Sequence, residues 1–325
     1  MQLHPPPIAT NIKGEPRLIG IELEYAGLTL PQAAKIVASH FGGEVEEATH
    51  NKIYVHCEQD GKFQLEFDVG WVKKLSERVA AAEPESFEAA TLGAIENLST
   101  SIMSVMMPYE IITPPMPIAA LSSLDKLCRE LRAHGAKGTS ASPLYAFGTH
   151  LNIDMPQIEP HELKRYLAAY FLLEEILREG YKPMDVARRL SPFVDPYPDS
   201  YGEVILQPSY NPDFNRLVDD YLEHNPTRNR SLDMLPLFAF YDEPRVRAVV
   251  GEGEKINPRP AFHYRLPNCH LDQPDWSVIA EWNRWVEVER LAEDEARLAA
   301  MSASWLRDGK QDWRDAANKW AVGLR

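Results

Sequence analysis

The stretch Leu18-Ile-Gly-Ile-Glu-Leu-Glu-Tyr25 alternates apolar and polar residues, which is the pattern of a β-strand with one buried face. One face would carry Ile19, Ile21, Leu23 and Tyr25, and the other Gly20, Glu22 and Glu24. Two carboxylates about 4 Å apart repel by roughly 1 kcal/mol in water, and by several-fold more in a partly buried site. The acidic face therefore either meets solvent or surrounds a cation.

Four later segments show the same alternation. Their polar faces would carry Gln64, Glu66 and Asp68, then Glu110, then His150, Asn152 and Asp154, and lastly Arg259, Ala261, His263 and Arg265. Asp60-Gly61 has the composition of a hairpin turn, and the strands do not alternate regularly with helices. This favours an α+β fold: an antiparallel sheet with helices packed on one face.

The remaining chain predicts helices at 31–41, 85–104, 117–134, 160–180 and 275–300. Between 182 and 258 prolines are frequent, so only short helices are expected there. We expect an irregular arm at 1–16, a single domain at 17–302 and a C-terminal tail at 303–325.

The composition of the chain argues against several classes of function. A net charge of −14 argues against nucleic acid or an anionic membrane surface as a partner. The three widely spaced cysteines predict no disulfide framework or metal knuckle. The opening residues lack the apolar stretch of a secretory leader, and no apolar run reaches membrane length, so we expect neither a secretory signal nor a membrane helix in this sequence. The expected location is the cytoplasm.

The five polar faces together predict a site for cations and phosphate. If they line one surface, five carboxylates converge: Glu22, Glu24, Glu66, Asp68 and Glu110. Such a cluster gathers hard cations, and one imidazole from His150 beside it fits Mg²⁺ or Mn²⁺. Arg259 and Arg265 offer the bidentate donors that suit a phosphate. The pattern suggests nucleotide-dependent phosphoryl chemistry.

Simpler interpretations stay open from the residues alone. A Glu-x-Glu strand can be a solvated edge, His150 can be a structural histidine, and Arg259 and Arg265 can neutralise the acids in a salt-bridged face. The sequence has no P-loop, no dinucleotide-binding glycine motif, no His-Glu-x-x-His and no nucleophile elbow.

Five short motifs in order resemble the amidoligase family, part of the carboxylate–amine ligase superfamily of glutamine synthetase and γ-glutamylcysteine ligase. They are IGIELEY, LEFDVGW, YEIITPP, GTHLNID and RPAFHYRLPN, spread over about residues 17–290. The resemblance implies ATP and two or three divalent ions, Mg²⁺ or Mn²⁺, in a funnel over an antiparallel sheet whose outer face is covered by helices.

The resemblance also implies residue roles. Glu22, Glu24, Glu66 or Asp68, Glu110 and His150 match metal-ligand positions, and Arg265 matches an arginine that contacts phosphate or the substrate carboxylate. His263 stands where the family has a glutamate, which removes one ligand or replaces it with nitrogen. We expect Arg265, Arg259 and His263 to be catalytic and Arg259, Arg265 and Arg230 to bind ATP. For Arg228 and Arg230, capping and surface salt bridges are an equal alternative.

The expected activity is ATP-dependent amide formation through an acyl phosphate, from a small-molecule or peptide carboxylate and an amine or ammonia. Two alternatives are a guanidino kinase-like phosphotransferase and a non-catalytic scaffold with a salt-bridged sheet face. The oligomeric state is open, because the C-terminal helix with Trp282 and Trp285 could pack internally or against a second subunit.

Overall fold

The computed structural model describes residues 1–67, 108–142, 145–157, 159–179 and 194–320. The helix predicted at 85–104 and the candidate ligand Asp68 lie outside these described residues.

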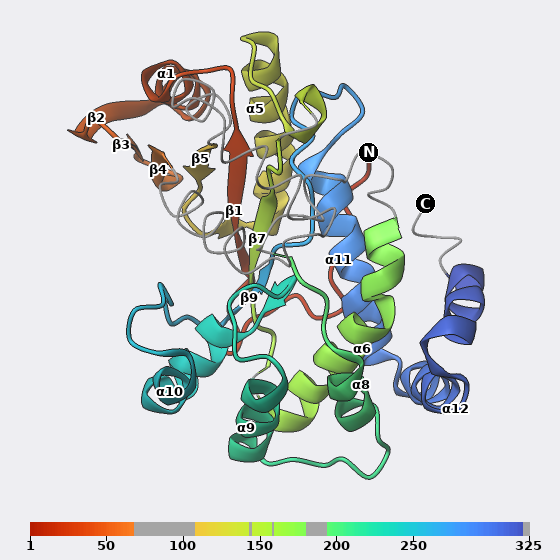
Figure 1. The fold of residues 1–325 in the computed structure, drawn as a ribbon. Coiled ribbons are helices and arrows are strands. Elements are labelled where there is room, and N and C mark those ends of the chain that lie inside the picture. Colours follow the sequence, from red (N-terminus) through yellow and green to blue (C-terminus); the bar gives the residue numbers. More distant parts are fainter. Residues whose placement is uncertain (68–107, 143–144, 158, 180–193, 321–325) are drawn as a thin grey trace, which may run out of the picture.

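A single antiparallel sheet organises the described chain (Figure 1). Its nine described strands are β1 (Leu18–Tyr25), β2 (Gly43–Thr49), β3 (Lys52–Cys57), β4 (Gly61–Phe67), β5 (Tyr109–Ile112), β6 (Met116–Pro117), β7 (Thr149–Asp154), β8 (Leu232–Asp233) and β9 (Ala261–Tyr264). The strand order is β2-β3-β4-β5-β1-β7-β9-β8, and β6 pairs with the start of β1. The prediction of an α+β fold with an antiparallel sheet is confirmed.

Helices surround this sheet. They are α1 (Leu30–Phe41), α5 (Leu121–Ala133), α6 (Pro160–Glu179), α8 (Asp199–Ile205), α9 (Phe214–His224), α10 (Leu235–Val250), α11 (Val278–Glu293) and α12 (Glu295–Trp320). In Figure 1, α1 lies beside β2 to β4, α6 and α11 run side by side, and α12 packs outside α6. Helices α8, α9 and α10 gather at the end of the sheet near β9 (Figure 1).

The structure corrects the predicted elements at three places. Residues 43–49 form edge strand β2, although this acidic segment shows no apolar alternation and has no buried residue. The region 182–258 contains the 16-residue helix α10, which is kinked at Asp242. The helix predicted at 275–300 is two helices, because the chain leaves helical geometry at Asp294.

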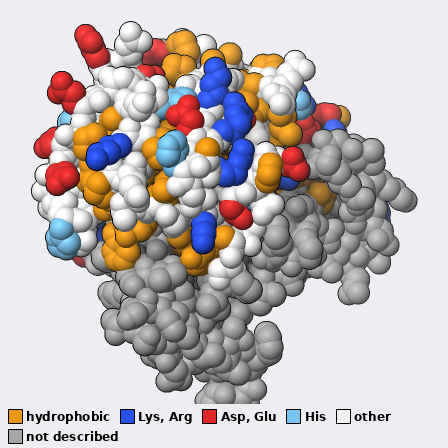
Figure 2. Space-filling view, turned by 90° about the horizontal axis from the view of Figure 1, so that it is seen from above, with side chains coloured by type: hydrophobic (Ala, Val, Ile, Leu, Met, Phe, Trp, Pro, Cys, Tyr) orange, Lys and Arg blue, Asp and Glu red, His pale blue; other side chains and the backbone are white. Residues whose placement is uncertain are grey.

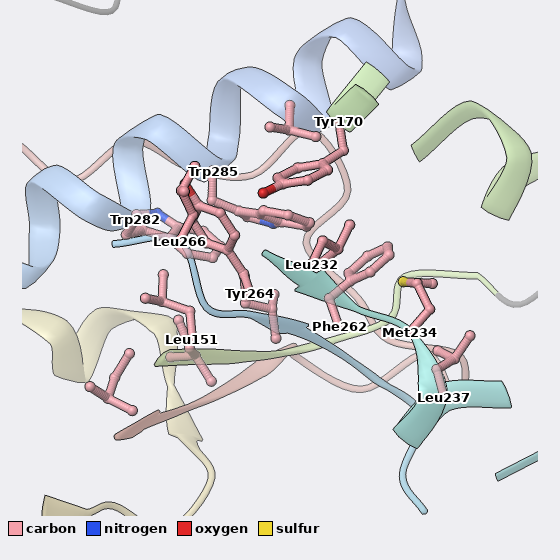
Figure 3. Close-up of a cluster of buried hydrophobic side chains, with 14 of the residues drawn as sticks. Leu151, Tyr170, Leu232, Met234, Leu237, Phe262, Tyr264, Leu266, Trp282 and Trp285 are labelled. Carbon is pink, nitrogen blue, oxygen red and sulfur yellow. The ribbon is translucent and has the colours of Figure 1, made fainter. Parts of the chain in front are cut away.

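The apolar faces of the strands form the core, as their alternation predicts. Phe262 and Tyr264 of β9 are fully buried, and they point towards Tyr170 of α6 and Trp285 of α11 (Figure 3). The Trp285 ring centroid lies 5.0 Å from that of Phe262 and 5.2 Å from that of Tyr264. Because this packing leaves the apolar face no contact with water, the opposite face carries the polar chemistry.

A buried ion pair joins the start of β1 to α11. Arg17 donates to Glu289 through Nη1 at 2.8 Å and Nη2 at 2.6 Å, and both side chains are fully buried. Trp285 Nε1 donates to the same carboxylate at 2.6 Å. The first strand of the site is thereby fixed to a helix more than 270 residues away along the chain.

The outer surface is mixed in charge. Figure 2, seen from above, shows a line of Lys and Arg side chains among acidic and hydrophobic ones, although the chain has a net charge of −14. Within the described residues, no helix has both the length and the apolar character needed to cross a bilayer.

Candidate active site

Strand register brings three glutamates into one row. Glu110 of β5 lies opposite Glu24 of β1 on one side and opposite Glu66 of β4 on the other. Residues directly opposite in an antiparallel pair have Cβ atoms about 5 Å apart, so the three carboxylates are close neighbours. Like charges in this arrangement destabilise the sheet unless a cation or a proton compensates them.

Two further polar rows cross the neighbouring strands, one over β1 and β7 and one over β7, β9 and β8. Glu22 lies opposite His150, and Asn152 lies opposite His263. His263 in turn lies opposite Asp233 on the edge strand β8. The polar faces of six strands therefore meet on one surface of the sheet: β4, β5, β1, β7, β9 and β8.

His150 connects the glutamates of β1. Its Nδ1 lies 2.6 Å from Glu22 Oε2, and its Nε2 lies 3.7 Å from Glu24 Oε1. The side chain is only 6 % exposed, and Nε2 has no hydrogen-bond partner in the described part of the chain. Because a carboxylate only accepts, Nδ1 carries the proton towards Glu22, and in the neutral ring Nε2 points its lone pair towards Glu24.

Asn152 connects these two rows. Its Nδ2 donates to Glu22 Oε1 at 2.8 Å, and its Oδ1 accepts from Arg259 Nη2 at 2.5 Å. His263 Nδ1 lies 2.8 Å from the same Oδ1. One amide thus connects a carboxylate, a guanidinium and an imidazole.

Burial and charge tune the ionisation of this site. Burial alone would raise the pKa of Glu22, but the hydrogen bond and charge of His150 and the charge of His263 hold it well below its usual 4.5. Burial lowers the pKa of His263 well below 6.5, and the positive charge of Arg259 acts in the same direction. At neutral pH Glu22 is therefore a carboxylate, and burial disfavours the charged form of His263.

Two sets of side chains have the composition and spacing of a cation site. Glu24, Glu110 and His150 form one, and Glu22, His150 and His263 form the other, each with ligand atoms within 4.8 Å of one another. His150 Nε2 between these carboxylates fits a divalent ion, because such an ion would satisfy a buried ring nitrogen that has no hydrogen-bond partner among the described residues.

A basic group with one buried acid lies at the β8–β9 end of the site. Asp233 is fully buried, and its Oδ2 lies 3.6 Å from Arg228 Nε. Burial raises the pKa of Asp233, while Arg228 and the nearby Arg265 and Arg259 oppose that rise. Three guanidinium groups around one carboxylate leave a local positive charge, which suits an anion.

A comparison with known protein families shows which family the chain belongs to. A family model described as "Putative amidoligase enzyme" matches residues 15–287, most of the 325-residue chain. The chain belongs to the amidoligase family. The prediction of an amidoligase enzyme is thereby confirmed. A search of curated proteins found no match.

Two of the predicted site residues of this amidoligase, Glu66 and Arg230, pair with other groups of the protein. Glu66 is in the acidic row, but its Oε2 pairs with Lys52 Nζ at 2.8 Å, so it belongs to neither cation set. Arg230 donates to the backbone oxygens of Pro196 at 2.5 Å and His224 at 3.2 Å, an arrangement that ties loops together.

The sequence alone does not indicate the positions of three residues in this amidoligase. Alternation predicts Asn152 on the polar face, but its central position depends on strand register. Asp233 lies in a two-residue strand that no pattern indicates. For Arg228 the sequence is equally compatible with a phosphate contact and a structural one, and the structure places it beside Asp233.

Proposed function

We propose that this amidoligase is an ATP-dependent carboxylate–amine ligase that works through an acyl phosphate on the polar face of the sheet. The observation that carries the proposal is the buried, unpartnered Nε2 of His150 beside Glu24 and Glu110. We further propose that this face is the floor of a funnel of glutamine synthetase type.

Glu24, Glu110 and His150 would hold one divalent ion, Mg²⁺ or Mn²⁺, and Glu22 and His263 would contribute to a second. When bound, such ions neutralise phosphate oxygens and so lower the barrier to phosphoryl transfer. Glu22 keeps the proton of His150 on Nδ1, which orients Nε2 towards the cation.

Two arginines would handle the phosphate. Arg259 is fixed by Asn152 and Arg265 lies near Asp233, so both guanidinium groups are held at the same end of the site. Preorganised cations stabilise charge that develops on a transferring group without having to move during the reaction. Arg230 and Glu66 stay candidates for ATP and metal contacts, as does Asp68 outside the described residues.

The chemistry divides into two steps. An oxygen of the substrate carboxylate attacks the γ-phosphorus of ATP, the bond to the β-phosphate oxygen breaks, and ADP leaves. The nitrogen of an amine or of ammonia then attacks the acyl carbon, loses a proton and expels phosphate. Neither step requires a nucleophile from the protein.

Glutamine substitutions at Glu24 and Glu110 test the proposal. We expect E24Q and E110Q to abolish ATP turnover while far-ultraviolet circular dichroism and the melting temperature stay close to wild type. E46Q is the matched control, because Glu46 is an exposed residue of the edge strand β2. ADP release is measured with a panel of carboxylates and amines.

Product analysis separates the outcomes. Release of ADP and free phosphate with a new amide supports the ligase. A phosphorylated amine or guanidine without an amide would instead identify a phosphotransferase. Turnover at the wild-type rate in both E24Q and E110Q would overturn the assignment of the cation site.

A further inference from the structure

A serine, a histidine and a glutamate meet between helices α1 and α5, away from the polar face of the sheet. His40 of α1 lies between two side chains of α5. Its Nε2 is 3.0 Å from Ser123 Oγ, and its Nδ1 is 3.0 Å from Glu130 Oε1. The hydroxyl, the imidazole and the carboxylate are thus connected in the order that activates serine as a nucleophile.

Helix geometry explains why one imidazole reaches both side chains. Ser123 and Glu130 are seven residues apart, so they lie on one face of α5, two turns and about 10 Å apart along its axis. An imidazole with a hydrogen bond at each ring nitrogen covers most of that span. His40 belongs to the last turn of α1, which packs against α5. The packing of two helices therefore holds the three groups together.

The carboxylate determines which nitrogen of His40 carries the proton. A carboxylate only accepts hydrogen bonds, so Nδ1 must donate to Glu130. In the neutral ring the lone pair is then on Nε2, where it accepts the hydroxyl hydrogen of Ser123. Because the His40 side chain is only 9 % exposed, water competes little for this nitrogen. The imidazole is oriented as a general base for the hydroxyl.

This group lies on the other side of the sheet from the carboxylate rows. Phe41, which follows His40, stacks on Phe63 of β4 with ring centroids 4.7 Å apart. Phe63 is fully buried on the apolar face of β4, and Glu66 points to the opposite face by alternation. An activity of Ser123 would therefore be separate from the proposed ligase reaction.

We propose that Ser123 is a base-activated nucleophile that takes the acyl group of a small activated ester or thioester. Ser123 is only partly exposed, so a small donor reaches its hydroxyl more readily than a bulky one. A donor with a good leaving group suits this arrangement, because removal of the hydroxyl proton is the assistance that the three side chains supply.

The reaction of Ser123 is a single acyl transfer. Oγ attacks the acyl carbon, and the hydroxyl proton passes to His40 Nε2. The C–O bond of the ester, or the C–S bond of the thioester, then breaks. The imidazolium returns the proton to the departing alkoxide or thiolate, so that acylated Ser123 and a free alcohol or thiol are the products.

Labelling of the full-length chain with a fluorophosphonate, followed by peptide mass spectrometry, tests this inference. The hydroxyl oxygen of an activated serine displaces fluoride from the phosphorus of this reagent and leaves a stable adduct. We expect Ser123 to react at least about a hundredfold faster than Ser122, its exposed neighbour on α5, because a general base contributes about 10²–10⁴-fold. p-Nitrophenyl acetate should acetylate Ser123 and release p-nitrophenolate.

Two variants distinguish a nucleophile from a hydrogen bond that only joins the helices. H40Q should slow the labelling of Ser123 by about a hundredfold, because the base is lost. E130A should slow it by about tenfold, because Nδ1 then lacks the acceptor that orients the ring. S122A is the control and should leave the rate at Ser123 unchanged. Circular dichroism checks folding, and E130A changes a side chain that is 47 % exposed, so it serves even where H40Q does not fold.

Two results would overturn the inference. One is labelling of Ser123 no faster than that of Ser122, and the other is a rate that E130A and folded H40Q leave unchanged. In either case the three side chains would only tie α1 to α5. Neither result bears on the ligase proposal, which E24Q and E110Q test on the opposite face of the sheet.

Discussion

At the scale of single residues, Asn152 explains how the polar face tolerates so many ionisable groups. It is the one described side chain that contacts Glu22, Arg259 and His263 together, at 2.8, 2.5 and 2.8 Å. A buried network of this kind is costly when one member loses its partner. We infer that Asn152 positions the site without touching the reacting atoms.

Asn152→Asp tests that role. The substitution keeps an oxygen for Arg259 and His263 but replaces the donor that faces Glu22 with a second carboxylate oxygen. We expect the free energy of unfolding at pH 7, measured by urea denaturation with EDTA present, to fall by about 1–3 kcal/mol. N51D is the control, because Asn51 is exposed at the β2–β3 turn.

The loss of unfolding free energy in N152D should depend on pH, because it depends on the ionisation of Glu22. Its pKa in the folded state lies below the usual 4.5, so its contribution to stability is present above pH 4.5 and is lost as pH falls through the folded value. In N152D the new charge opposes ionised Glu22 and shrinks that contribution. The difference between wild type and variant should therefore narrow below pH 4.5; a difference that widens on acidification contradicts the assignment.

At the scale of elements, the attachment of β1 to α11 holds the first strand of the site in place. Arg17 also donates to the backbone oxygens of Asp154 at 2.8 Å and Ile8 at 3.0 Å, so it joins β1, the end of β7 and the N-terminal arm. A buried pair of this kind contributes little net energy, yet the loss of one partner leaves an uncompensated charge.

Glu289→Gln tests this attachment. We expect the variant to lose about 3–5 kcal/mol of unfolding free energy in urea, because the buried Arg17 charge then has no counter-ion. The double variant R17M/E289L, which removes both charges, should be more stable than E289Q. A single variant as stable as wild type would show that the ion pair is not what holds β1 to α11.

Much of this arrangement could be predicted from the alternation of the strands. Alternation correctly put Glu22, Glu24 and Glu110 on the face opposite Ile19, Ile21 and Leu23. Register could not be predicted, since it depends on which strands become neighbours. The pairing of Glu66 with Lys52, and of Asn152 with His263, exists only once β3 meets β4 and β7 meets β9.

Other elements could not be predicted from the sequence, because contacts with distant parts of the chain produce them. Strand β2 is acidic and exposed, so it has no apolar alternation, and it forms because β3 offers it an edge. Helix α10 has 16 residues in a region whose prolines indicated only short helices, and its Phe238 packs against Tyr221 of α9 with ring centroids 5.0 Å apart. Tertiary packing outweighed local propensity at both places.

At the scale of the whole molecule, the sheet separates two functions. The helices α6 and α11 bury its apolar face, as Figure 3 shows around Tyr264 and Trp285, and give it the stiffness that a preorganised site needs. The opposite face gathers carboxylates and imidazoles near β1 and arginines near β8 and β9. Under the proposed function, this division would put cations and phosphate side by side, as phosphoryl transfer requires.

An anomalous difference map from crystals grown with MnCl₂ and a non-hydrolysable ATP analogue tests the central claim most directly. We predict a manganese peak within roughly 2.0–2.3 Å of His150 Nε2 and a Glu24 oxygen. The analogue's phosphates should lie between that peak and Arg265. A map without manganese at His150, in which Glu22 and Glu24 pair only with protein cations, would contradict the account.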